Sequence, residues 1–268
     1  TVSGLVLLSL IIQNQYSIMK YGILSVIALL FACMVYTQDM EPVLAEAAKL
    51  EKNLKETEAL DTYISVLKIQ PSNVKALCRA AELTGRIGSR FKDDNKKTEY
   101  FTTAKSYAEA ALNQKQDYAD ANYTMAYAAM KMATVTKGKE RAACLRDMKY
   151  YADSALLFNP NHAGALYITG KWNIEIYDLN VAEKAAVKVL FGGMPKASLE
   201  AAILNFEKAR TANPWMLVNY LDLANTYVKN HSTGKAIDVL KKMVKMPPRT
   251  GDDESLKAEG RTLLASLQ

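Results

Sequence analysis

The spacing of apolar residues predicts helices along most of the chain after residue 38. Amphipathic segments, with apolar residues three or four positions apart, alternate there with short polar turns. Each of five turns follows one such segment and precedes another, so the sequence predicts an all-α fold of repeated helix pairs. Four of these turns centre on a proline and one on a glutamine: Pro71, Gln116, Pro160, Pro214 and Pro248.

Small residues recur at a fixed distance from these turns. The last two turns lie 34 residues apart, which is the period of tetratricopeptide repeats, where the second helix of a pair approaches a small residue of the first. Such a residue stands ten positions after each turn, and Ala47 fits the same place in the first repeat; the others are Ala81, Ala126, Gly170, Ala224 and Ala258. A second series marks the second helices: Ala59, Ala104, Ala202 and Ala236. Together they predict a right-handed α-solenoid of tetratricopeptide-like helix pairs.

Three repeats are longer than 34 residues, and the extra residues fall between the two helices of a pair. Residues 85–97 are polar and predict a loop with some helix extension, whereas residues 134–139 predict a short turn between two lengthened helices. A final helix from Thr250 to Leu267 is expected to cap the solenoid. Residues 178–190 predict an inserted helix with a glycine stop and one inward apolar face: Leu179, Ala182, Ala186, Val189 and Leu190.

Residues 1–37 differ in character from the rest of the chain. They carry a single charge, Lys20, followed by the apolar run Ile23–Val35, an order typical of a secretory signal peptide. In that interpretation residues 1–18 are upstream translation; the alternative is a membrane anchor that also uses an earlier short apolar run. We expect export, to a bacterial periplasm, and a solenoid of about five repeats plus a cap over residues 38–268.

Three cysteines bear on the compartment. Residues 30–33 loosely resemble the lipobox of bacterial lipoproteins, although Phe31 departs from that pattern. Cys33 is therefore interpreted as an ordinary residue of the apolar run, with acylation as the alternative. Cys78 and Cys144 could pair in an oxidising compartment, but each lies among alanines at helical spacing, and we expect two separate buried thiols.

The sequence offers little material for catalysis or for a cofactor. Its two histidines, His162 and His231, lie beside turns, where a capping or solvent-exposed role is ordinary. No Cys-x-x-Cys or His-x-x-x-His spacing for zinc occurs, and the glycine-rich residues 192–198 lack the strand and lysine spacing of a phosphate loop. The net charge of +6 is spread along the chain, which disfavours nucleic acid. We expect no enzyme, cofactor, metal or nucleic-acid partner.

The first helices of the pairs should form a concave wall, and this wall is the expected binding surface. Tyrosine combines a rigid apolar ring with a hydrogen-bonding hydroxyl and suits peptide recognition. The more ordinary interpretation is that some of the tyrosines fill the bottom of the groove or pack on the long inserted segments. Positions three before, one after, and four or five after the small residues should face the wall, which selects Tyr123, Tyr127, Tyr167, Lys171, Asn225 and Lys229.

The inserted helix allows a second interpretation. Lys184 and Lys188 lie beside its Ala/Val/Leu face, as in helices that lie in the interface of a membrane. Because that face is mostly Ala and Val, packing on the solenoid is the interpretation we favour.

Short motifs in the second half go beyond the general repeat. They include Asn161-His162, Gly170-Lys171-Trp172, Val189-Leu190-Phe191-Gly192, Phe206-Glu207-Lys208-Ala209 and Asn213-Pro214. With these motifs, residues 159–265 resemble the regulator of microtubule dynamics family of tetratricopeptide-like proteins. The resemblance implies an all-helical right-handed solenoid and a protein-binding role. Its animal members are associated with microtubules and mitochondria, an association that the predicted bacterial signal peptide argues against here.

Two functions of different classes follow from these features. The first is a non-enzymatic, exported tetratricopeptide scaffold that binds a protein or peptide in its concave groove. The second is a lipid- or helix-anchored structural component of a bacterial envelope assembly, which contacts partners through its convex surface and inserted helix. In both, the membrane is contacted only through a possible N-terminal anchor.

Overall fold

The fold, seen in a computed structural model, is described for residues 19–20 and 39–268. The chain divides into two compact units, Thr1–Pro42 and Val43–Gln268, and the second contains the repeats. The predicted signal peptide or anchor at residues 1–37, with its cysteine, lies almost entirely outside the described residues. Within the described part, every helix is too short or too polar to cross a bilayer.

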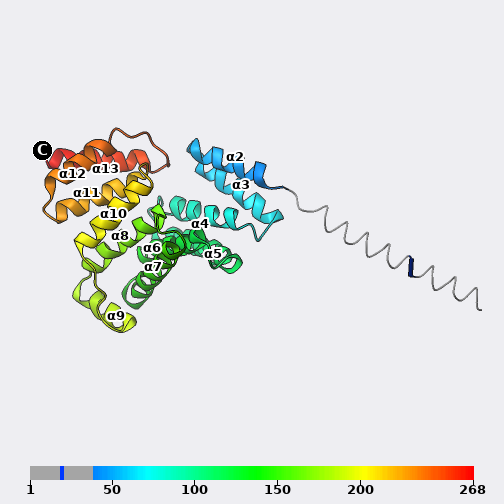
Figure 1. The fold of residues 1–268 in the computed structure, drawn as a ribbon, viewed down its shortest axis with the longest axis horizontal. Helices are drawn as coiled ribbons and strands as arrows, with labels where there is room; N and C mark the ends of the chain where they lie inside the picture. The colour runs from blue at the N-terminus through cyan, green and yellow to red at the C-terminus, as the bar shows by residue number, and fades with distance from the viewer. Residues whose placement is uncertain (1–18, 21–38) are drawn as a thin grey trace, which may run out of the picture. The chain divides into compact units, whose positions relative to one another are not determined.

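Twelve helices follow one another in the described residues, and the fold is all-α (Figure 1). They pack as consecutive pairs, α4 with α5, α6 with α7, α8 with α10, and α11 with α12, while α2 and α3 precede them. Helix α9 is inserted in the α8–α10 pair, and α13 follows the last pair. Their bounds are α2 Glu41–Lys52, α3 Glu56–Ile69, α4 Val74–Gly88, α5 Asp94–Gln114, α6 Ala119–Ala133, α7 Gly138–Phe158, α8 Ala163–Tyr177, α9 Val181–Phe191, α10 Leu199–Ala212, α11 Leu217–Lys229, α12 Thr233–Met243 and α13 Asp253–Ser266.

Side chains in the turns cap the N-termini of several helices. The Asn73 side chain accepts the backbone N–H of Ala76 at the start of α4, and the His162 ring does the same at the start of α8. Asn180 and Glu183 form a capping box at the start of α9, which satisfies two backbone N–H groups. The capping role that the sequence suggests for His162 is therefore confirmed.

The small-residue series marks close helix contacts, as predicted. Ala81, Ala126 and Ala224 are fully buried, and a Cβ on Gly170 would stand 2.5 Å from the ring of Phe206 on α10. The second-helix series Ala59, Ala104, Ala202 and Ala236 is fully buried as well.

One member of the first series is predicted wrongly. Ala258 is exposed, and Gly260 is buried in its place, against Met243. In the other repeats the first helix begins three residues after the turn residue, as Val74 does after Pro71, but α13 begins five residues after Pro248. The two extra residues move the small position by the same amount.

One of the predicted insertions is confirmed and one needs correction. Residues 85–97 form a loop with helix extension, as predicted: residues 89–93 connect α4 to α5, and the rest of the stretch belongs to the two helices. Helix α9 forms and stops at Gly192, which has a φ of 70°. The expected inner face is only partly right: Leu179 is buried and Ala186 packs against the core, but Val189 is exposed and Val187 is buried in its place. The rotation of α9 is set by an ion pair, because Glu183 is bound by Arg141 of α7 at 2.5 Å.

The first and last repeats touch through polar groups. The guanidinium of Arg90, just after α4, contacts Asp252 beside α13 at 2.5 Å and also binds Glu56 of α3. The backbone N–H of Gly251 donates to the Glu56 carboxylate at 3.1 Å. Segments about 200 residues apart in sequence are thereby joined.

Candidate binding groove

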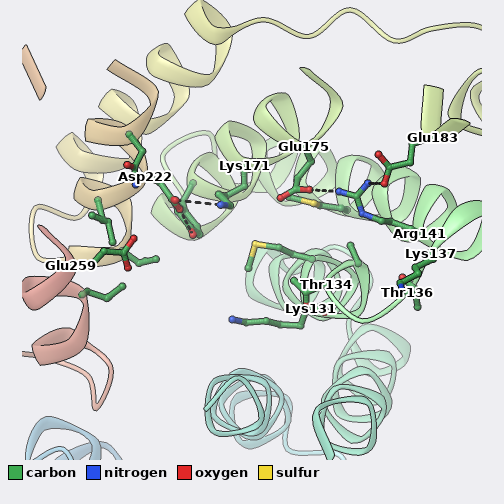
Figure 2. Close-up of a pocket in the computed structure, with 18 residues that line it drawn as sticks. Lys131, Thr134, Thr136, Lys137, Arg141, Lys171, Glu175, Glu183, Asp222 and Glu259 are labelled. Atoms are coloured by element: carbon green, nitrogen blue, oxygen red, sulfur yellow. Dashed lines mark hydrogen bonds and ion pairs between the residues drawn. The ribbon is translucent and has the colours of Figure 1, made fainter. Parts of the chain in front are cut away.

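The concave side holds a hollow of about 640 Å³, which we name the Lys131 groove (Figure 2). The first helices α6, α8, α11 and α13 contribute most of its walls, together with the α6–α7 turn, two residues of α7 and one residue of α9. Its lining residues are Met130, Lys131, Ala133, Thr134, Thr136, Lys137, Arg141, Met148, Tyr167, Lys171, Glu175, Glu183, Val218, Leu221, Asp222, Asn225, Leu256 and Glu259.

Helix α8 presents a polar row to the groove. Tyr167, Lys171 and Glu175 are four residues apart and therefore share one helix face. The Tyr167 hydroxyl donates to the Asp222 carboxylate at 2.8 Å, and the Lys171 ammonium lies 3.3 Å from the same carboxylate. Burial is the largest single influence and acts to lower the pKa of Lys171, but the charge and hydrogen bond of Asp222, together with the charges of Glu175 and Asp178, raise this pKa above its usual value. Lys171 and Asp222 therefore neutralise each other.

Glu175 is held in the same way. Arg141 of α7 bridges Glu175 at 2.6 Å and Glu183 of α9 at 2.5 Å, so that both carboxylates share one guanidinium (Figure 2). This contact fixes α9 against the rim of the groove. Because Arg141 is bound by two carboxylates, its charge is not available to a partner.

Lys131 differs from the other cations of the groove. Tyr123, Tyr127 and Lys131 form one face of α6, and the Lys131 ammonium lies 5.2 Å from the centre of the Tyr127 ring. Among the described residues, no carboxylate or other acceptor forms an ion pair or hydrogen bond with it. Burial lowers the pKa of Lys131 to about 8. The site thus offers a partly desolvated ammonium with free hydrogen-bond donors, which an anionic group would complete.

Three of the predicted site residues line the Lys131 groove, namely Tyr167, Lys171 and Asn225. Tyr127 lies beneath Lys131 and is 8% exposed; its ring is so close to α4 that a Cβ on Gly85 would stand 2.7 Å from it. Tyr167 is also only 8% exposed. Both tyrosines are therefore core residues with one edge toward the groove.

The other two predicted residues lie elsewhere. Tyr123 lines a second hollow, described below, and its ring centre is 4.7 Å from that of His162. Lys229 lies outside both hollows, where it pairs with Asp178 and sits over the ring of Tyr177 at 5.6 Å.

Two groove residues were missed at the sequence level although the repeat signals them. Lys131 stands five residues after Ala126, and Glu175 stands five residues after Gly170. This offset is one of the wall-facing positions and is the one that selects Lys229. The spacing rule therefore points to both residues, although the predicted site does not include them.

The second hollow measures about 350 Å³ and lies between α4, α6 and the start of α8. In it, the His162 Nε2 is 2.8 Å from one Asp120 oxygen, and the Tyr118 hydroxyl donates to the other oxygen at 2.7 Å. The His162 Nδ1 accepts the backbone N–H of Ala165 at 3.0 Å. Both ring nitrogens of His162 are thus occupied, which leaves none to act as a general base.

A row of alternating charges, which we name the α4 charge chain, borders this hollow. Glu82 is contacted by Arg79 at 2.6 Å and by Arg86 at 2.9 Å, and Arg86 reaches Glu56 at 2.8 Å. Arg79 also binds Glu51 at the end of α2. Burial acts to raise the pKa of Glu82, but the two arginines outweigh it and lower it. The charges within the α4 charge chain therefore neutralise one another, and its ion pairs connect helices α2, α3 and α4.

The two cysteines outside the N-terminal region are free thiols, as expected. Cys78 is buried, and burial raises its pKa to about 12, so it is a thiol at neutral pH. Cys144 is only half-buried and lies 3.8 Å from the Thr136 hydroxyl. In the part of the chain that the structure describes, His, Cys, Asp and Glu side chains form no cluster suited to a metal ion.

Comparisons with known proteins agree with this fold. Residues 43–268 match the family described as Regulator of microtubule dynamics protein 1-3. Regulator of microtubule dynamics protein 1 of Mus musculus is 27% identical over 250 residues, covering 92% of this chain and 80% of the relative. The Homo sapiens protein of the same name is 25% identical over 192 residues, covering 71% of this chain and 60% of the relative.

A solved tetratricopeptide-repeat protein from Thermus thermophilus has the same fold. It superposes with a TM-score of 0.58 at 15% sequence identity, covering 83% of this chain and 98% of that one. At this identity, the similarity concerns the arrangement of helices and not the residues of the groove.

Proposed function

The chain belongs to the regulator of microtubule dynamics family, and we propose that it is a non-enzymatic scaffold that binds a protein or peptide in the Lys131 groove. Tetratricopeptide folds present a continuous concave surface to their partners. In this chain, a hollow of about 640 Å³ lies over α6, α8 and α11.

The observation that carries the proposal is the unpaired ammonium of Lys131. Every other buried cation near the groove has a carboxylate partner within the described residues: Arg141 has Glu175, Lys171 has Asp222, and Arg86 has Glu82. A desolvated charge without a partner costs free energy. A bound carboxylate would remove that cost, so the expected partner brings an acidic side chain or a chain terminus to Lys131.

The remaining lining residues of the Lys131 groove determine which side chains of a partner fit beside its acidic group. Met130, Val218, Leu221 and Leu256 supply apolar surface beside Lys131. Glu259 on α13 faces the hollow from the opposite side (Figure 2). A segment that fits therefore pairs an acidic residue with a neighbouring apolar side chain.

Selection from a random peptide library displayed on phage tests this proposal. The wild-type protein is expected to enrich peptides with an Asp or Glu beside an apolar residue. Lys131→Met should lose these peptides, whereas Lys208→Met, at an exposed lysine of α10, should keep them. Enrichment of peptides without acidic residues, or equal binding by the Lys131→Met protein, would contradict the proposed site.

The cell compartment is a separate proposal that rests on residues 1–37 alone. We expect the exported protein to lack everything before Gln38, or to begin at an acylated Cys33 if the anchored alternative is correct. Intact-mass measurement of the protein from its native host distinguishes these forms, and a product that retains residues 19–37 without modification would contradict export.

A further inference from the structure

The residues around α9 form a projecting segment, residues 179–197, which we name the α9 arm. Figure 1 shows α9 at one edge of the fold, next to α7. One side of α9 is fixed to the solenoid: Val187 is 1% exposed, Glu183 binds Arg141, and the Phe191 ring centre lies 6.5 Å from that of Trp172. The opposite side of the helix therefore has a defined direction, away from the solenoid.

That outward side is apolar. Val181 and Val189 are 87% and 82% exposed, and Ala185 between them is exposed too. Residues four apart share one face of a helix, so these three form a single stripe. Leu190 and Met194 extend the exposed apolar surface toward the end of the arm. A monomer gains nothing from presenting such a stripe to water, which indicates a surface that is covered in use.

The charged residues on the outward side of the α9 arm are all positive. Lys184, Lys188 and Lys196 are exposed, and Glu183 is the arm's single acidic residue. Because Glu183 is turned inward and bound by Arg141, it does not neutralise these lysines. Asp178, just before the arm, is likewise paired with Lys229. The outward side thus combines an apolar stripe with three cations.

We propose that the α9 arm docks on the surface of a bilayer that contains anionic lipids. A helix that lies in a membrane interface buries an apolar stripe while lysines beside it reach the headgroups with their flexible stems. Each lysine near an anionic leaflet adds to the attraction. The stripe holds only Val and Ala, without the Trp, Tyr or Arg that anchor protein interfaces. The stripe therefore lacks the anchors of a protein interface, and the three exposed lysines beside it supply charge complementarity to an anionic lipid surface.

Vesicle co-sedimentation tests the proposal with residues 39–268, which contain the whole compact unit Val43–Gln268 and its core. The fragment is expected to bind vesicles of phosphatidylcholine with phosphatidylglycerol, to bind pure phosphatidylcholine weakly, and to be released by salt. The double variant Lys184→Glu, Lys188→Glu should lower the partition coefficient about tenfold or more. Val181→Ser with Val189→Ser should lower it less, because it removes only apolar contact.

A matched control separates the arm from net charge. Lys241→Glu with Lys245→Glu changes the charge by the same amount, at the same spacing, on exposed residues of another helix and its following turn. This control is expected to bind as the wild type does, and circular dichroism melts should show all variants folded. Equal loss in the control, equal binding to both kinds of vesicle, or a self-association that the valine variants abolish would each overturn the proposal.

Discussion

Arg86 and Lys131 occupy the same place in successive repeats, five residues after the small residues Ala81 and Ala126. Arg86 is held by Glu82 and Glu56, whereas the Lys131 ammonium lies over the ring of Tyr127 and has no carboxylate partner among the described residues. The neighbour one turn earlier makes the difference, because this position holds Glu82 on α4 and Tyr127 on α6.

The comparison shows how one repeat can serve two purposes. Where a glutamate precedes the cation, the two form an ion pair. On α4, these ion pairs also connect helices α2, α3 and α4. Where a tyrosine precedes it, the cation has no carboxylate partner in the described residues, and this difference is the basis of the proposed binding site. The repeat register supplies the direction of each side chain, and the residue one turn earlier decides whether the cation is neutralised.

The largest expected effect tests the register itself. Gly170→Leu should lower the free energy of unfolding by about 3 kcal/mol or more, because even a Cβ there would stand 2.5 Å from Phe206. Gly234→Leu is the control, since a side chain at that helical glycine would meet nothing within 4 Å. Denaturant unfolding measures both, and equal midpoints would show that the helix phase is wrong.

Removing the carboxylate of the α4 charge chain comes next. Glu82→Ala should lower the free energy of unfolding by about 3 kcal/mol, because Arg79 and Arg86 would lose their shared partner while remaining partly buried. Glu99→Ala, at an exposed position of α5, should change it little. If the two variants unfold at the same denaturant concentration, the α4 charge chain does not stabilise the packing of α2, α3 and α4.

Removing the cation of the groove should act in the opposite direction. Lys131→Met is expected to raise stability at pH 7 by on the order of 1 kcal/mol, since an unpaired, desolvated charge is replaced by an apolar group. The folded-state pKa of about 8 lies below the ordinary 10.5. The unfolded chain therefore binds more protons between these values, and wild-type stability should rise with pH across them.

Thermal melts from pH 7 to 10.5 measure this difference. The advantage of Lys131→Met should shrink as the pH rises through that window and the wild-type lysine loses its proton. A variant that is less stable than the wild type at pH 7 would mean that Lys131 has a partner after all.

The smallest effect concerns the rim of the groove. Tyr167→Phe removes one hydroxyl that donates to Asp222 and should cost about 1 kcal/mol, because the ring remains packed and Lys171 still pairs with the carboxylate. Tyr167→Ala should cost about 3 kcal/mol or more through the loss of a buried ring. Similar costs for both substitutions would show that Asp222, and not packing, dominates at this position.

The sequence predicted the helix pairs and the small-residue contacts because turn residues and helical periodicity are local signals. It failed at Ala258, where two extra residues after Pro248 shift the register. It also failed for part of the inner face of α9. There the Ala/Val composition is similar all round the helix, and the long-range ion pair of Glu183 with Arg141 decides the rotation.

The groove was predicted in part. Offsets from the small residues place Tyr167, Lys171 and Asn225 correctly along its wall. Burial of Tyr127, however, depends on how closely α4 approaches at Gly85, and pairing of Lys229 depends on Asp178 of the inserted segment. Such contacts between distant segments have no signature in a single sequence.

The pKa of Lys131, measured by NMR on side-chain-labelled protein with Lys131→Arg to assign the signal, is the most direct test of the proposed binding site. A pKa near 8 is expected in the free protein, because the ammonium is desolvated and has no carboxylate partner. With an acidic peptide from the library selection bound, the pKa should rise by more than about one unit, since a carboxylate then stabilises the charge. A pKa near 10.5 in the free protein, or no change on peptide binding, would contradict the proposed binding site.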